Sequence, residues 1–341
     1  MPVHPQVAQY LEEIAKIDLP PFDEMTPEFM RSTLTPSPDP HIPSSTIENR
    51  SIPVNGTEIP IRLYTPPEAQ IKKNEVLPAL VFFHGGGWVI GTLDAYDGVC
   101  QDLAGTASCK VISVDYRMAP EFPYPVPFED SYLATEWISA HASELGIDRQ
   151  QIAIGGDSAG GNLATAVALK ARQSESLNLV YQLLVYPVTN YRFDTESYQR
   201  FGSNYFLTKR AMEWFWEQYL PDESAGREIY ASPLRCKNLT GMPDALVITA
   251  GYDPLYSEVV QYMDLLRKSD VLHSHQIFAV NPLYSEVVQY MDLLRKSDVN
   301  VEHLNYEDMI HGFFRRSDLY DRAYEAVQAA GKKLKQIYAR I

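Results

Sequence analysis

The strongest constraint on the fold is the regular alternation of short apolar runs with longer segments of helical periodicity, which continues to the C-terminus. Short apolar runs predict strands, here at Ala79–Phe83, Val111–Val114, Gln151–Ile154, Tyr181–Val185, Ala245–Thr249 and Val301–Leu304. Helical patterns lie between or after them, most clearly at Phe128–Ala142, Gly160–Gln173 and Tyr320–Tyr338. Strands that alternate with helices form a mostly parallel sheet covered on both faces. The sequence therefore predicts an α/β fold.

Two other regions add to this pattern. Near the N-terminus, residues 5–17 have helical spacing and a proline-rich stretch follows them. Two alternating runs within Thr46–Thr65 then surround Asn55-Gly56, which predicts an antiparallel hairpin. Further on, Thr189–Ser232 interrupts the alternation with a long aromatic-rich segment. This segment is either an ordinary core helix or, as its place after a strand end favours, a lid inserted above the sheet.

The negative net charge excludes two classes of binding partner. The chain has 341 residues, and its 44 acidic and 29 basic side chains give a formal net charge of −15. Nucleic acids and anionic membranes bind basic surfaces, so neither is expected as a partner. The cysteines form no CxxC pair, which supports neither a disulfide framework nor a zinc site. The N-terminus lacks the pattern of a signal peptide and no apolar run is long enough for a membrane helix, so we expect a cytoplasmic protein.

The segment Gly156-Asp157-Ser158-Ala159-Gly160 has the pattern G-x-S-x-G between a β-branched run and a helical run. In this context the pattern is typical of a sharp strand–helix turn that exposes the serine hydroxyl. The glycines are needed because side chains there would clash with the neighbouring strand and helix. Taken alone, the pattern also fits a phosphate-binding turn, so Ser158 is a candidate nucleophile that needs further evidence.

A second glycine-rich segment, "HGGGW", begins at His84 directly after a predicted buried strand. Consecutive glycines leave backbone N–H groups free to converge on one point. The N–H groups of Gly86 and Gly87, together with that of Ala159, can form an oxyanion hole for a tetrahedral intermediate. A merely flexible loop is the alternative. We expect His84 to hold the loop by a hydrogen bond rather than to carry a proton.

The third segment is "EDMIHGFF", which places His311 in a loop between the last predicted strand and the last helix. Asp253 ends the preceding predicted strand, so the chain order is Ser158, Asp253, His311. The loops at the carboxyl ends of parallel strands open on one edge of the sheet. These three side chains can therefore meet in a triad despite their separation in sequence.

In this order, "HGGGW", "DYRMAPE", "GDSAGG", "YDPL" and "IHGF" resemble the hormone-sensitive-lipase-like family of α/β-hydrolases, the bacterial family IV carboxylesterases. The resemblance implies an α/β-hydrolase fold with a mostly parallel eight-stranded sheet flanked by helices. It also implies that Ser158 is the nucleophile, His311 the general base and acid, and Asp253 the orienting carboxylate. In "DYRMAPE", Arg117 and Glu121 are implied to brace the region beside the site.

The resemblance also implies a helical cap built from two segments. We expect residues 1–45 to form its N-terminal part and 189–232 its inserted part, with the hydrolase core at 46–188 and 233–341. The acyl pocket beneath the cap is expected to be lined by aromatic side chains, namely Trp88, Phe201, Tyr205 and Trp214.

The function expected from these residues is hydrolysis of small acyl esters through an acyl-enzyme intermediate, with no metal and no organic cofactor. An amidase or peptidase on the same fold would use the same triad. A ligand-binding homologue without catalysis is a further alternative, because plant hormone receptors resemble this family and lack the histidine.

One feature departs from the family pattern. The eighteen-letter segment "PLYSEVVQYMDLLRKSDV" occurs twice, at 254–271 and 282–299, so that Asn281 in the second copy corresponds to Asp253 in the first. Either Asp253 keeps its strand end and the second copy is surplus, or the second copy takes the helix position and Asn281 replaces the carboxylate. We favour the first arrangement. In that case we expect the surplus helix to cover its apolar stripe against a neighbouring subunit or to promote aggregation.

Overall fold

The computed structural model describes residues 2–18, 20–70, 72, 75–174, 176–268 and 299–341. Within them, eight strands form one sheet in the order β1-β2-β4-β3-β5-β6-β7-β8. β2 pairs antiparallel with β1 and with β4, and all the other neighbours are parallel. The strands are β1 (Thr46–Val54), β2 (Thr57–Thr65), β3 (Leu77–Phe83), β4 (Lys110–Val114), β5 (Ile147–Asp157), β6 (Tyr181–Val185), β7 (Ala245–Tyr252) and β8 (Val301–Ile310).

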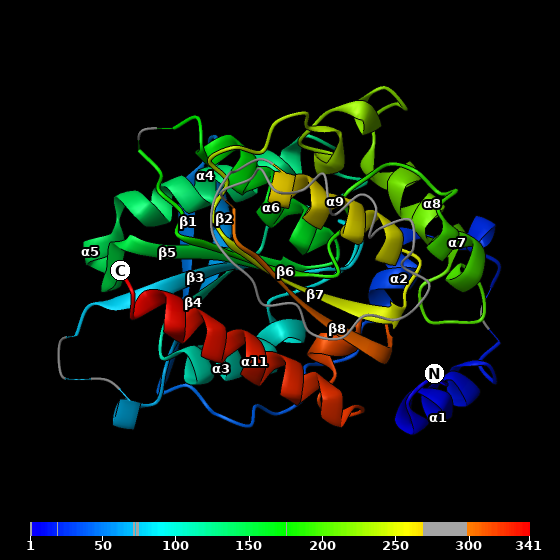
Figure 1. The fold of residues 1–341 in the computed structure, drawn as a ribbon, viewed down its shortest axis with the longest axis horizontal. Coiled ribbons are helices and arrows are strands. Elements are labelled where there is room, and N and C mark those ends of the chain that lie inside the picture. The colour runs from blue at the N-terminus through cyan, green and yellow to red at the C-terminus, as the bar shows by residue number, and fades with distance from the viewer. Residues whose placement is uncertain (1, 19, 71, 73–74, 175, 269–298) are drawn as a thin grey trace.

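Helices cover both faces of this sheet (Figure 1). The central strand β3 shows why: Val81 and Phe83 enter one hydrophobic cluster and Leu80 and Phe82 the other, and all four are fully buried. Side chains alternate across a strand, so an unbroken apolar run requires an apolar cover on each side. One face is covered by α4 (Val126–Ala140), α5 (Ala142–Leu145), α6 (Ala159–Ala171) and α9 (Tyr256–Lys268), the other by α3 (Asp97–Ala107) and α11 (Asp321–Tyr338).

The observed elements extend several of the predicted ones. The predicted hairpin is present and turns at Asn55 and Gly56, which have φ angles of 49° and 75°. The predicted last strand stopped at Leu304, whereas β8 continues to Ile310. β8 lies at the edge of the sheet, and its residues 305–308 are half-exposed and mostly polar, so they lack the apolar pattern that marks a buried strand. His311 consequently follows the strand directly.

Two segments outside the core pack beside the carboxyl ends of the parallel strands (Figure 1). The N-terminal segment contains α1 (Pro5–Ile14) and α2 (Pro27–Ser32), and the segment inserted after β6 contains α7 (Glu196–Phe201) and α8 (Lys209–Tyr219). The Trp214 indole N–H of α8 donates a hydrogen bond to the Met25 carbonyl at 3.2 Å, which ties the two segments together.

Arg31 attaches α2 to the core. Its guanidinium donates two hydrogen bonds of 2.7 Å to the Glu121 carboxylate and others to the carbonyls of Val89 and Ala119. Arg117, the other residue expected to brace this region, forms a bidentate pair with the buried Asp130.

The repeated segment is described only in part. Its first copy forms α9, which buries Val259, Tyr262, Met263 and Leu266 at helical spacing. β7 ends at Tyr252, directly before Asp253, so Asp253 keeps the strand end that the first arrangement gives it. The predicted surplus helix, like Asn281, lies outside the described residues. Among the helices that are described, none is both long and apolar enough to cross a membrane.

Candidate active site

Ser158 lies at the turn between β5 and α6. Its φ and ψ angles of 54° and −119° are unusual for a residue with a side chain. The turn is held because the Ser158 N–H donates to the Val185 carbonyl and the Val188 N–H donates to the Ser158 carbonyl. Gly160 is required here, since a Cβ atom at that position would lie 2.0 Å from the Phe83 carbonyl oxygen. The strained turn thus presents the serine hydroxyl at the carboxyl edge of the sheet.

A hydrogen-bonded chain connects Ser158, His311 and Asp253. His311 Nε2 lies 2.9 Å from Ser158 Oγ, and His311 Nδ1 lies 2.7 Å from Asp253 Oδ2. An ionised carboxylate can only accept, so the proton is on Nδ1 and the serine hydroxyl donates to Nε2. Asp253 is fully buried, and its other oxygen accepts the Leu255 N–H at 2.8 Å. The structure therefore brings the three predicted side chains together in the order that nucleophilic catalysis requires.

The sheet topology explains this meeting. β5, β7 and β8 are parallel, and Ser158, Asp253 and His311 each follow the carboxyl end of one of them. The Tyr186 ring, after β6, lies against the His311 ring at a centroid distance of 4.5 Å.

The "HGGGW" segment forms a tight loop after β3. The Gly86 carbonyl accepts the N–H groups of both Val89 and Ile90. Gly87 has a φ of 60°, and a Cβ atom there would lie 2.1 Å from the Phe215 ring of α8. Only glycine meets both conditions. The N–H groups of Gly86, Gly87 and Ala159 form no hydrogen bond with the described residues, which leaves them available to an external acceptor.

Asp157 supports this loop, a role that motif reading did not assign to it. Its buried carboxylate accepts the Gly85 N–H at 2.8 Å and the Tyr96 hydroxyl at 3.0 Å. Burial raises the pKa of Asp157, whereas the charge of Arg315 and these hydrogen bonds oppose the rise. The residue before the serine thus links the turn at Ser158 to the glycine loop. His84 is fully buried and its Nδ1 lies 2.9 Å from the Gly85 carbonyl, as expected for a structural histidine.

The four aromatic residues expected to line an acyl pocket have different environments. Trp88 is fully buried and stacks on Tyr219 at 4.1 Å, so protein atoms cover its ring. Trp214 is also buried. The rings of Phe201 and Tyr205 both pack on Tyr252, directly before Asp253 in the chain.

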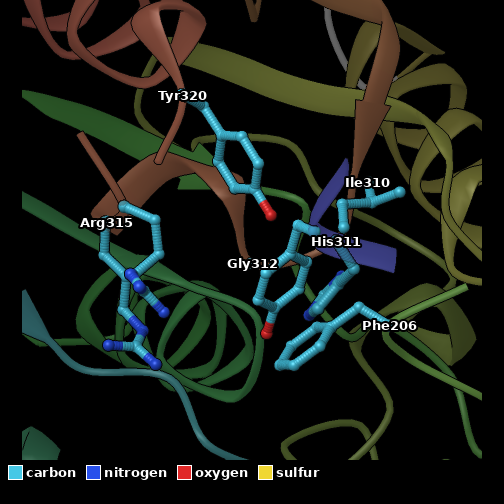
Figure 2. A pocket seen from close by; sticks show the side chains of 8 residues that line it. Phe206, Ile310, His311, Gly312, Arg315 and Tyr320 are labelled. Carbon is cyan, nitrogen blue, oxygen red and sulfur yellow. The ribbon is translucent and has the colours of Figure 1, made fainter. Parts of the chain in front are cut away.

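A pocket opens directly beside His311 (Figure 2). Phe206 contributes an apolar wall, and it is 45% exposed, which is unusual for a phenylalanine. Phe206 was not among the predicted lining residues, because nothing in the sequence distinguishes it from its aromatic neighbours Phe201 and Tyr205. The remaining lining comes from α1 and from the segment after β8, and consists of Tyr10, Ile310, Gly312, Arg315, Arg316 and Tyr320.

Glu258 on α9 is a fully buried carboxyl group near the site. Its Oε1 accepts the N–H groups of Thr189 and Asn190, at the start of the inserted segment, while Oε2 has no partner among the described residues. Burial raises the pKa of Glu258 to about 8, assisted by the nearby charge of Asp253. The group therefore holds a proton in the native protein at pH values where an unfolded chain would release it.

We expect this proton to make stability depend on pH. Between the unfolded pKa of about 4.5 and the native value of about 8, folding takes up a proton. The free energy of unfolding should therefore fall as pH rises through this window, by up to roughly 1.4 kcal/mol per pH unit. Glu258→Gln, which mimics the protonated acid, should flatten this slope in urea unfolding at pH 5, 6.5 and 8. The exposed Glu12→Gln is the matched control, and an unchanged slope in Glu258→Gln would contradict the assignment.

No group of histidine, cysteine, aspartate and glutamate side chains suited to a metal ion occurs among the described residues.

Comparisons with known proteins define the class. The sequence profile of the family described as alpha/beta hydrolase fold matches residues 80–279. The solved structure of a thermostable esterase from Pseudomonas putida ECU1011 superimposes with a TM-score of 0.83 at 32% identity, covering 98% of this chain and 97% of that one. The chain belongs to the α/β-hydrolase family.

Several of its relatives within that family are ester hydrolases, and a more distant one is the gibberellin receptor GID1A of Arabidopsis thaliana, 32% identical over 57% of this chain and 59% of its own length. The carboxylic ester hydrolase LipN of Mycobacterium tuberculosis is 41% identical over 70% of this chain and 63% of its own length. The ethyl acetate hydrolase of Pseudomonas putida is 38% identical over 64% of this chain and 68% of its own length. These relatives confirm the resemblance to hormone-sensitive-lipase-like carboxylesterases that the motifs indicated.

Proposed function

We propose that this protein is a serine carboxylesterase that hydrolyses short- to medium-chain acyl esters through an acyl-enzyme intermediate. The observation that supports the proposal best is the chain of hydrogen bonds from Asp253 through His311 to Ser158. Its second support is the set of free N–H groups on Gly86, Gly87 and Ala159.

Acylation follows from these contacts. Ser158 Oγ attacks the ester carbonyl carbon as its proton moves to His311 Nε2. The carbonyl oxygen becomes an oxyanion that the N–H groups of Gly86, Gly87 and Ala159 stabilise. Asp253 keeps the histidine in the required tautomer and stabilises the imidazolium. When the carbon–oxygen bond to the alcohol breaks, His311 returns the proton to the leaving alkoxide.

Deacylation repeats the sequence with water. His311 Nε2 takes a proton from water as the water oxygen attacks the acyl carbon, and then protonates Ser158 Oγ as the acid leaves. Every proton in the cycle passes through one nitrogen atom.

We also propose that residues 1–45 and 189–232 act together as a cap over the site. The hydrogen bond from Trp214 to Met25 and the shared lining of the pocket by Tyr10 and Phe206 support this role. Of the four aromatic residues expected to line the acyl pocket beneath this cap, Trp88 and Trp214 are covered by protein atoms.

The acyl-chain preference tests the proposal. We expect kcat/KM for p-nitrophenyl esters to be highest at roughly two to eight acyl carbons and to fall for longer chains, because a packed aromatic cap limits pocket depth. The ethyl acetate hydrolase among the relatives supports a short-chain preference. Hydrolysis of long-chain triglycerides that rises sharply at an oil–water interface would contradict it.

The same assay separates the alternatives. Matched p-nitroanilides test for an amidase, which would cleave the anilide well above the rate of the Ser158→Ala protein, whereas an esterase would not. A ligand-binding homologue would bind the substrates without releasing p-nitrophenol.

A further inference from the structure

The pocket beside His311 is more polar than a site for neutral esters requires. Among its lining residues are two guanidinium groups, Arg315 and Arg316, and two phenols, Tyr10 and Tyr320. In Figure 2, Arg315 and Tyr320 lie to the left of His311, and the Phe206 ring lies just below it. A small neutral acyl ester offers nothing that two cations would recognise.

The two arginines differ in how their charges are balanced. Arg316 forms a bidentate pair with Asp318, with both hydrogen bonds at 2.8 Å, and this pair lowers the pKa of Asp318. Arg315 forms no hydrogen bond or ion pair with the described residues, and its Nη1 atom is buried without a partner. A buried unpaired donor is costly, and the cost is larger for a charged group.

Two neighbouring groups, Tyr96 and Asp157, interact with the Arg315 guanidinium, but neither accepts a hydrogen bond from Nη1. The guanidinium carbon lies 5.7 Å from the centre of the Tyr96 ring, which is a cation–π contact and not a hydrogen bond. Burial raises the pKa of Asp157 and the charge of Arg315 lowers it, but no hydrogen bond joins them, and the Asp157 oxygens accept the Gly85 N–H and the Tyr96 hydroxyl instead. The Arg315 guanidinium therefore has no hydrogen-bond partner among the described residues, and Arg315 lines the same pocket as His311.

The position of the pocket indicates which part of a substrate would enter it. His311 Nε2 has to reach the leaving alkoxide oxygen, so the alcohol part of the ester passes beside this histidine. A group carried by the alcohol would then lie against the residues that follow His311, including Arg315. The net charge of −15 opposes anions at long range, but screening over about 8 Å leaves the local cations dominant inside the pocket.

We propose that Arg315, with the hydroxyl groups of Tyr10 and Tyr320, forms a subsite for a carboxylate on the alcohol part of the ester. A guanidinium binds a carboxylate through paired charge-assisted hydrogen bonds, and the phenols add neutral donors. Esters of hydroxy acids are therefore the favoured substrate class. This inference rests on the proposed esterase activity.

A matched pair of acetates tests it. 4-Acetoxybenzoate carries a carboxylate on its leaving phenol, and methyl 4-acetoxybenzoate is the neutral counterpart. We expect Arg315→Met to lower the ratio of kcat/KM for the anionic over the neutral ester by about 10- to 100-fold, chiefly through KM. Arg315→Lys, which keeps the positive charge, should lower this ratio of kcat/KM values less than Arg315→Met does. Arg192→Met removes the same charge from an exposed arginine paired with Asp194 and should leave the ratio unchanged.

Binding to the Ser158→Ala protein gives a readout that does not depend on turnover. Calorimetric titration of this protein with 4-acetoxybenzoate measures Kd. When Arg315→Met is combined with Ser158→Ala, Kd should rise by a similar factor. Equal effects of Arg315→Met on the two acetates, or the same loss in Arg192→Met, would overturn the subsite.

A second pair of esters tests whether the subsite serves the alcohol part or the acyl part. p-Nitrophenyl hemisuccinate carries a carboxylate on its acyl part, and p-nitrophenyl pentanoate is the neutral counterpart. A selective loss for the hemisuccinate would overturn the assignment to the alcohol part. Failure to hydrolyse any of these esters would instead overturn the proposed function, so the two failures are distinguishable.

Discussion

Replacing Ser158 by alanine should lower kcat for p-nitrophenyl acetate by roughly 10⁴- to 10⁶-fold, and His311→Ala should have an effect of similar size. The triad acts as a unit, so loss of either residue removes nearly all of its contribution and leaves what the oxyanion hole and binding supply. Steady-state kinetics measure the loss, and a fluorophosphonate probe should label the parent protein and not Ser158→Ala.

Thermal unfolding provides the control for this prediction. Both substitutions make the side chain smaller at positions that are almost buried, and neither removes a large apolar group, so the fold should be retained. Retention of more than a tenth of the parent activity in a folded variant would show that another nucleophile carries the reaction.

Asp253→Asn should lower kcat by about 10⁴-fold, the loss found for the same change in the best-studied serine triad. An amide at this position can donate to His311 Nδ1 and so favour the wrong tautomer, and it cannot balance the imidazolium charge. The 2.7 Å contact between Asp253 Oδ2 and His311 Nδ1 is the structural reason for expecting so large an effect.

The repeated segment supplies a matched control, since Asn281 occupies the corresponding place in the second copy. Asn281→Asp alone should leave activity unchanged. Recovery of activity in Asp253→Asn combined with Asn281→Asp, but not in Asp253→Asn alone, would mean that the second copy can supply the carboxylate.

Sequence patterns predicted the buried part of the fold better than its edges. The central strands were found because apolar residues such as Val81 and Phe82 are buried on opposite faces of the sheet. The end of β8 was missed because an edge strand can be polar and half-exposed. Similarly, β5 begins at Ile147, four positions before the predicted start at Gln151. The difference arose because Asp148, Arg149 and Gln150 are polar and at least partly exposed.

The triad could be predicted because each member follows a strand and lies within a motif. The surrounding groups could not. Asp157 and Glu258 act through backbone N–H groups that are distant in sequence, at Gly85 and at Thr189, and no local pattern records such a contact. The packing of Trp88 against Tyr219 could not be predicted either, because an aromatic residue in a motif fits a pocket wall and a core contact equally well.

The pairing of β7 with β8 has a consequence for the tolerance of this fold to insertions. The register from Ala245 opposite Val301 to Tyr252 opposite Ile310 fixes the strand ends that carry Asp253 and His311, whatever the length of chain between the strands. Because the paired strands themselves hold both side chains, Asp253 and His311 should stay in contact in variants whose chain between β7 and β8 is lengthened or shortened.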